Sequence, residues 1–187
     1  MSETMSLPSD LPEPHDDGEA DHLRGLTLPG VALPSTGGGS VDLSTLRGRT
    51  VLYIYPATGV PGEGPPSDDW DSIPGARGCT PQSCSFRDHH AELAALDAAV
   101  LGLSRQSTDE QREAAERLRL PFELLSDADG RLTEALRLPT FETAGRVFLK
   151  RMTLFLRDGV IEDVLYPVFP PDRSADDALD WLRRHPA

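Results

Sequence analysis

Two cysteines, Cys79 and Cys84, are the residues of this sequence best suited to carry chemistry. Four residues separate them, whereas a thiol–disulfide exchange motif has two. A zinc site would recruit His89 and His90, but cysteines at this spacing with adjacent histidines lack the paired ligand spacings of zinc-binding motifs. Free cysteines also occur as inert, buried apolar residues. The spacing favours a redox role over a zinc site or a purely structural role, and we expect no metal or cofactor.

Cys79 stands where a helix is predicted to begin. The apolar residues that follow recur at helical spacing: Phe86, Leu93, Leu96 and Val100. Thr80 and Pro81 suit its first turn. Free N–H groups and the helix dipole favour negative charge at this end, so the position favours a thiolate, which is the nucleophilic form. Arg77, two residues earlier, would add to the effect.

The spacing of the cysteines also sets a geometric condition. In an intact helix, residues five apart lie about 8.6 Å apart at Cα, whereas a disulfide needs less than about 7 Å. A disulfide between Cys79 and Cys84 therefore requires the start of the helix to unwind. We hypothesise that one cysteine attacks and the other resolves, with the first turn folded in the thiol form and locally melted in the disulfide form.

Apolar and turn patterns predict strands that alternate with helices around this segment. Two short strands over 26–34 and 37–43 form a hairpin that leads into a longer buried strand ending at Pro56. The elements expected after Cys79 and its helix are a strand at 99–104, a helix at 108–120, a strand at 122–127, a helix at 130–138, a hairpin at 152–168 turning at Asp158–Gly159, and a closing helix at 174–185 capped by Ser174. This order predicts an α/β domain with a mixed central sheet and helices on both faces, in the thioredoxin-like arrangement. A flavodoxin-like domain would need a fully parallel sheet and a phosphate loop, and is the less favoured alternative.

Residues 57–78 contain nine Gly and Pro and follow neither a helical nor a strand period. A loop of this length inside a compact domain is uncommon and tends to be functional, so we expect it to form a lid or a wall of a site. Trp70 in this loop is either a local anchor or an apolar wall beside Cys79.

The composition indicates one globular domain with an acidic extension. The net charge is −13, and seven of the acidic residues lie in the first 21 residues. Residues 1–22 are predicted to be a disordered acidic extension, and residues 23–187 to be the folded domain. The acidity disfavours nucleic-acid and membrane partners. No apolar stretch approaches the roughly 18 residues of a membrane-spanning helix, and no leader-like pattern is present, so a cytoplasmic protein is expected.

The segment GCTPQSCSFRDHHAEL, which holds both cysteines, resembles the active-site segment of the peroxiredoxins. The resemblance is to the bacterioferritin-comigratory or Q type, in which four residues likewise separate the attacking and resolving cysteines on one helix. It extends from about Leu26 to the C-terminus through LSTLRGRTVLYIYP, VLGLS, LLSDADGRLTEAL and RMTLFLRDGVIEDV.

The resemblance assigns roles to four residues. Cys79 resembles the peroxidatic cysteine, Cys84 the resolving cysteine, Arg151 the arginine beside the thiolate, and Pro56 the proline of the active-site motif. Because charged residues flank Arg151, the sequence without the resemblance favours a solvated position for it.

The sequence departs from the family pattern in one place. The family compresses proline, threonine and cysteine into eight residues, whereas here Pro56 and Cys79 are 23 apart and Ala76 stands in the threonine position. Thr58 is the favoured replacement, folding back to hydrogen-bond the sulfur, and Thr80 is the alternative.

The resemblance implies a thiol-dependent peroxidase that reduces hydrogen peroxide and organic hydroperoxides. Cys79 would become a sulfenic acid and then form a disulfide with Cys84, and thioredoxin would reduce that disulfide. A redox-sensing binding module and a protein thiol–disulfide oxidoreductase are the rival functions for the same pair. Because both cysteines lie on one segment, a monomer is expected.

Overall fold

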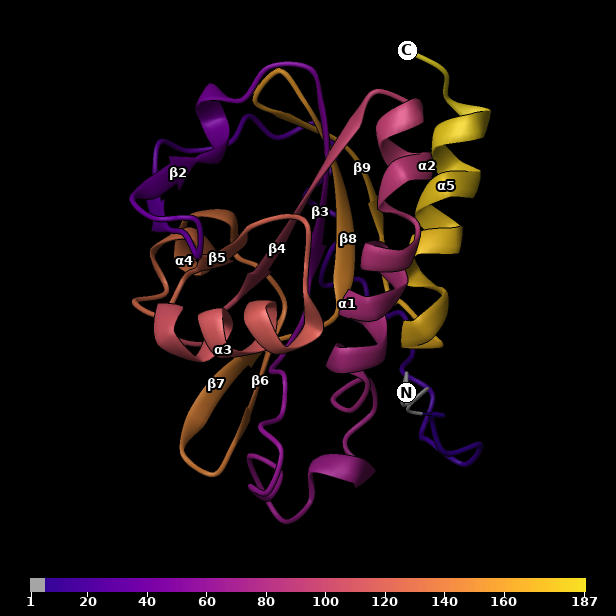
Figure 1. Ribbon diagram of the computed structural model, residues 1–187. Coiled ribbons are helices and arrows are strands. Elements are labelled where there is room, and N and C mark those ends of the chain that lie inside the picture. The colour runs from indigo at the N-terminus through magenta and orange to yellow at the C-terminus, as the bar shows by residue number, and fades with distance from the viewer. Residues whose placement is uncertain (1–5) are drawn as a thin grey trace.

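The computed structural model describes residues 6–187 and is built around one five-stranded mixed sheet (Figure 1). The strands follow the order β5-β4-β3-β8-β9. β3, β4 and β5 run parallel, whereas β8 pairs antiparallel to β3 and β9 pairs antiparallel to β8. Their bounds are β3 Arg49–Ile54, β4 Ala98–Ser104, β5 Leu124–Ser126, β8 Met152–Arg157 and β9 Val160–Leu165. The predicted α/β architecture with a mixed central sheet is confirmed.

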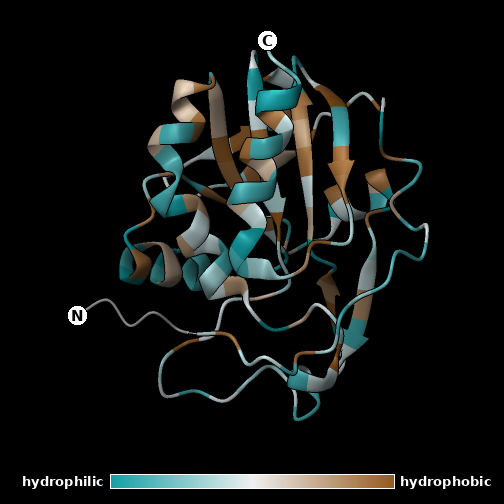
Figure 2. Ribbon diagram, turned by 90° about the vertical axis from the view of Figure 1, so that its right-hand side faces the viewer, coloured by the Kyte–Doolittle hydropathy of each residue, from teal (hydrophilic) through white to brown (hydrophobic). Residues whose placement is uncertain are grey.

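Helices cover both faces of this sheet, and successive side chains of β3 enter two different cores. Val51 and Tyr53 pack beneath α1, α2 and α5, whereas Leu52 and Ile54 pack with α4 and the β1–β2 hairpin. The bounds are β1 Ala32–Pro34, β2 Ser40–Asp42, α1 Cys79–Asp88, α2 His90–Ala95, α4 Arg131–Leu136 and α5 Ser174–Arg184. Figure 2 shows the outward face of α5 as largely hydrophilic, as expected for a surface helix.

The predicted helix over 108–120 is observed as α3, Thr108–Leu118. Ser107 and Glu110 form a capping box at its start, and Arg117 Nε donates to Glu113 Oε1 at 2.7 Å. No helix within residues 6–187 is both long and apolar enough to cross a bilayer.

The segment before the predicted strand at 99–104, expected to be one helix, forms two helices, and the strand itself is observed as β4. α1 ends at Asp88, α2 runs to Ala95, and Val100 belongs to β4. Asp97, which lies between α2 and β4, has φ 57° and ends the helical backbone there. The helical spacing of apolar residues includes Val100 although this residue lies in β4, because a buried strand also carries apolar residues.

The β8–β9 hairpin turns at Asp158–Gly159, as predicted, and both residues have positive φ (50° and 79°). A second hairpin was not predicted: β6, Thr140–Thr143, pairs with β7, Arg146–Leu149. Its turn, Ala144–Gly145, also has positive φ at both residues. Alanine is rare at such a position, so Ala144–Gly145 does not match the Asn-Gly or Asp-Gly pattern by which such a turn is predicted.

Part of the predicted disordered extension, residues 1–22, is ordered against the domain. Residues 1–5 lie outside the described residues, and residues 6–22 contain no helix or strand. However, Ala20 is buried, and Asp17 and Glu19 both bind Lys150. Acidic side chains that find a cation and a hydrogen-bond donor offset the entropy of ordering, which composition alone does not reveal.

Candidate active site

Cys79 is the first residue of α1 and is 3% exposed. The residue before it, Gly78, adopts φ 111° and offers no side-chain cap to the helix. The N–H groups of the first turn are therefore not bonded to a capping side chain, and they favour an anion at this point. The structure places Cys79 where the sequence predicted, at the start of a helix and at the end of the long loop.

Gly78 is required by the close packing around Cys79. A Cβ at this position would lie 2.3 Å from Pro171 Cγ and 3.3 Å from Leu7 Cδ2, and its φ suits glycine. Pro171 belongs to the short turn that leads into α5. The backbone before the sulfur is thus packed between two segments that are distant in the sequence.

Arg151, the residue before β8, points its guanidinium at the cysteine. Its Nη2 lies 3.3 Å from Cys79 Sγ and donates to the carbonyls of Gly75, Ala76 and Arg77, each at 3.2 Å. The pairing of Met152 with Ile54 explains the position, because it sets Arg151 at the end of β3, from which the long loop departs.

The charge of Arg151 lacks a carboxylate partner. The residue is 3% exposed, and within residues 6–187 no carboxylate oxygen lies within 4.0 Å of its guanidinium. Burying a cation is costly unless an anion compensates it, and the sulfur of Cys79 is the group within reach that can carry a full negative charge. The arrangement stabilises a thiolate, or the negative charge that develops when that thiolate attacks.

A glutamine that the sequence analysis did not single out completes the contacts of Arg151. Gln82 is fully buried; its Oε1 accepts from Arg151 Nη1, and its Nε2 donates to Ser174 Oγ at 3.1 Å. Ser174 was predicted to cap α5, but it is the first residue of that helix and makes no capping bond. The available signal for Gln82 was its position one turn after Cys79, on the same face of α1.

Cys84 lies on a different side of α1 from Cys79. Five residues at 100° each separate the two directions by about 140°. The thiol of Cys84 is half-buried, and both cysteines are free. Burial raises the pKa of the Cys84 thiol and nearby Asp88 raises it further, although Arg87 and Arg117 act in the opposite direction. The raised pKa favours the neutral thiol form of Cys84.

Neither of the two residues expected at the other end of the loop hydrogen-bonds the sulfur in the described part of the chain. Pro56 is buried directly after β3. The Thr58 hydroxyl donates to Gln106 Oε1 at 3.1 Å, and Gln106 Nε2 returns a bond to the Thr58 carbonyl. This corrects the expectation that Thr58 hydrogen-bonds Cys79, because a glutamine on a neighbouring segment holds it. Thr80, the alternative, also forms no hydrogen bond to the sulfur.

Arg77 does not act on Cys79 through its side chain either. Its Nη1 bonds to Asp71 Oδ2 at 2.7 Å, and both groups are substantially exposed. Arg77 instead contributes its backbone carbonyl to Arg151. His89 and His90 have no part in the site, and residues 6–187 hold no group of three side chains arranged to bind a metal.

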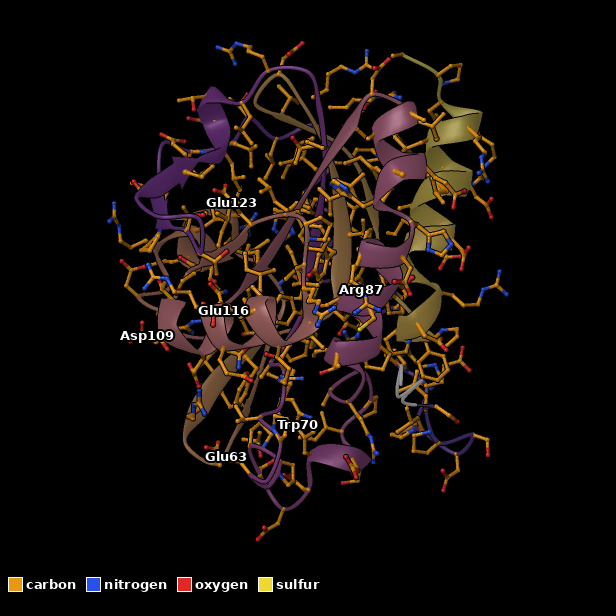
Figure 3. The ribbon with its side chains drawn as sticks, in the orientation of Figure 1. Glu63, Trp70, Arg87, Asp109, Glu116 and Glu123 are labelled. Atoms are coloured by element: carbon orange, nitrogen blue, oxygen red, sulfur yellow. The ribbon has the colours of Figure 1, made fainter. Side chains whose placement is uncertain are left out.

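The loop over residues 57–78 forms the walls of a cavity of about 440 Å³ that opens on Cys79. Trp70 lines this cavity and also packs edge-on against Phe148, at 4.9 Å between ring centroids. Figure 3 shows Trp70 and Glu63 on this loop, beside the β6–β7 hairpin. Trp70 is therefore both the anchor and the wall that the sequence left as alternatives.

The sheet, the helix that begins at a buried cysteine and the arginine beside it define a thioredoxin-like protein with a reactive thiol. The Redoxin family pattern matches residues 23–179. Peroxidoxin BcpB from Mycobacterium tuberculosis superposes with a TM-score of 0.70 at 30% identity, covering 89% of this chain and 100% of that one.

Relatives in sequence agree with the structural match. Chloroplastic peroxiredoxin Q of Sedum lineare is 29% identical over 161 residues, which cover 86% of this chain and 77% of that protein. Peroxiredoxin Bcp of Bacillus subtilis is 35% identical over 112 residues, or 59% of this chain and 61% of that protein. The chain belongs to the Redoxin family as a peroxiredoxin of the Q/Bcp type, and it is a thiol-dependent peroxidase.

Proposed function

We propose that Cys79 is the peroxidatic cysteine and that Arg151 stabilises the charge that passes from its sulfur to the peroxide. The observation that carries this assignment is the 3.3 Å approach of the buried Arg151 Nη2 to Cys79 Sγ, with no carboxylate near that guanidinium in residues 6–187. Such a cation, fixed before the reaction, is suited to lowering the barrier to cleavage of the O–O bond.

The chemical steps follow from the two thiols. The Cys79 thiolate attacks one peroxide oxygen, the O–O bond breaks, and the leaving alkoxide or hydroxide takes up a proton, which leaves Cys79 as a sulfenic acid. The Cys84 sulfur then attacks the Cys79 sulfur, releasing water and forming the disulfide. A dithiol reductant, thioredoxin in our proposal, returns both thiols and is itself oxidised.

The second step requires a conformational change. The cysteines start in different directions on an unbroken α1, so its first turns must unwind before the sulfurs meet. Two polar contacts hold these turns to α5: the bonds from Gln82 to Ser174 and from Ala175 N to Ser85 Oγ, at 3.1 and 3.3 Å. Hydrogen exchange of residues 79–88 should be faster in the disulfide form than in the thiol form, and equal protection would contradict the unwinding.

Hydrogen peroxide and organic hydroperoxides are both proposed substrates, since the reacting atoms are the same and the cavity has room for a substituent. Because the disulfide forms within one chain, we propose a monomer. A pair of free thiols that cycles through a reducible disulfide suits a reducing compartment, so the cytoplasm is the proposed location.

The decisive experiment compares Cys79→Ser with Cys84→Ser. Cys79→Ser should abolish peroxide consumption, whereas Cys84→Ser should complete one turnover, accumulate the sulfenic acid and fail to recycle with thioredoxin. Sustained consumption by wild-type protein with a thioredoxin system separates a peroxidase from a redox sensor. A Cys79→Ser variant that keeps full turnover would refute the assignment.

A further inference from the structure

Residues 6–22, which we name the N-terminal strap, lie across the end of the molecule that holds the active site (Figure 1). The strap contains no helix or strand, but ion pairs hold it to the domain. Lys150 Nζ donates to Asp17 Oδ2 at 2.8 Å and to Glu19 Oε2 at 3.0 Å. The Tyr166 hydroxyl donates to Asp17 Oδ1 at 2.8 Å. Lys150 therefore fastens the strap one residue before the catalytic arginine.

The beginning of the strap lines the active-site cavity. Ser6, Leu7 and Pro8 share this cavity with Cys79. Leu7 lies close enough to the glycine before the cysteine that a Cβ on Gly78 would be 3.3 Å from Leu7 Cδ2. The mouth of the site is thus bounded on one side by the strap and on the other by the loop over 57–78.

Size and chemistry indicate what this wall contacts. The cavity measures about 440 Å³, whereas hydrogen peroxide fills roughly twice the ~30 Å³ of a water molecule. The lining includes the charged residues Glu63, Asp71, Arg77 and Arg117 and a set of apolar residues: Leu7, Pro8, Ala57, Val60, Pro61, Pro65, Pro66 and Trp70. A peroxide oriented with its oxygens at Cys79 would leave an attached organic group against these side chains.

We propose that the N-terminal strap is a specificity-determining part of the active site, in which Leu7 contacts the apolar substituent of an organic hydroperoxide and the Lys150 clasp holds it there. The inference rests on the proposed function of Cys79. It assigns substrate preference to a segment outside the 23–179 region that matches the family.

The test measures kcat/KM for cumene hydroperoxide and for hydrogen peroxide and follows their ratio. Leu7→Ser should lower the ratio about tenfold, as expected when an apolar contact is removed from a binding pocket. Asp17→Asn, which weakens the clasp without touching the cavity, should lower it in the same direction by a smaller factor. Leu26→Ser is the matched control, because Leu26 is exposed and does not line the cavity.

A purely structural role of Leu7 would reduce both values of kcat/KM in parallel and leave their ratio unchanged. An unchanged ratio overturns the proposal. A raised ratio also overturns it, because the strap would then obstruct organic hydroperoxides instead of binding them.

A second measurement separates the strap from the peroxidase reaction. In the Cys84→Ser background, the rate of alkylation of Cys79 by N-phenylmaleimide is divided by the rate with iodoacetamide. Leu7→Ser should lower this quotient, because the aromatic reagent loses its apolar contact, and an unchanged quotient contradicts the proposal. If wild-type protein failed to consume peroxide, the proposed function would fall while this quotient still decided the role of the strap.

Discussion

Replacing Arg151 by Met removes the cation that contacts the Cys79 sulfur and keeps an unbranched side chain. The variant loses the bond at 3.3 Å to Sγ and leaves three loop carbonyls and Gln82 without their donor. We expect the second-order rate constant for peroxide reduction to fall by a factor of about 10² to 10³.

The expected size of this loss follows from the distance. Two unit charges 3.3 Å apart interact by about 5 kcal/mol at an effective dielectric constant of ~20, and by about 1.3 kcal/mol in water. Removing a single preorganised donor to a developing oxyanion costs about 2.7–4 kcal/mol, which falls between these limits. The transition-state contribution of Arg151 should lie in the same range, because its charge is buried but its partner carries a full charge only in the thiolate.

Stopped-flow tryptophan fluorescence provides the assay. The sequence has two tryptophans, Trp70 and Trp181, and Trp70 lines the cavity beside Cys79. A Trp181→Phe background therefore isolates the reporter near the sulfur. Arg151→Lys is the matched control: it keeps a point charge but cannot hold the three carbonyls, so its rate constant should fall between those of Met and wild type.

A rate constant for Arg151→Met within about threefold of wild type would refute the electrostatic role of this arginine. Equal losses for Arg151→Lys and Arg151→Met would also refute it, since the loss would then come from the loosened loop and not from the charge. Thermal unfolding of both variants shows whether each remains folded at the assay temperature.

The other predictions concern single side chains. Thr58→Val should change the peroxide rate constant by less than about threefold. It should destabilise the fold by about 1 kcal/mol, because the bond to Gln106 is lost. A loss of rate above about thirtyfold would mean that the hydroxyl acts on the Cys79 sulfur. Because burial raises the pKa of Cys84, peptide mapping after brief iodoacetamide treatment at neutral pH should find Cys79 labelled first, and faster labelling of Cys84 would contradict the assignment. Burial raises the pKa of Asp17, but the bonds from Lys150, the Glu19 backbone and Tyr166 outweigh it and lower the value from 3.8 to about 2. The Asp17–Lys150 clasp should therefore stabilise the fold fully above about pH 5, and this stabilisation should be lost as the pH falls toward 2. The difference in Tm between wild type and Asp17→Asn should accordingly shrink over that range. A difference independent of pH would exclude an ionised clasp.

Elements with a local signal were predictable from the sequence. The Asp-Gly turn of the β8–β9 hairpin, the capping box of α3 and the continuous apolar run of β3 each depend on a few neighbouring residues, and each is observed. The β6–β7 hairpin was missed because Ala144 occupies a left-handed position that alanine rarely adopts. Tertiary packing, by stacking Phe141 on Phe148 at 5.5 Å, stabilises a turn that local preference does not encode.

The residues of the site likewise fall into those that local sequence predicts and those that it does not. The position of Cys79 follows from local patterning, whereas the place of Arg151 beside it came from the family resemblance, since charged neighbours in the sequence favour a solvated face. The partner of Thr58 was not predictable, because Gln106 lies 48 residues away and nothing local links the two. The ordering of the strap likewise depends on Lys150, more than 130 residues further along the chain.

In the proposed cycle, the contacts that surround Cys79 before attack are also those that must break before its oxidised form meets Cys84. Arg151 binds three of the last four carbonyls of the loop and the side chain of Gln82, and Gln82 in turn binds Ser174 at the start of α5. This chain of bonds ties the first turn of α1 to two neighbouring segments. Conversion to a sulfenic acid removes the negative charge that the guanidinium compensates, and thereby weakens one member of the network. Oxidation itself therefore lowers the cost of unwinding α1, which couples the first chemical step to the conformational change that the second one needs.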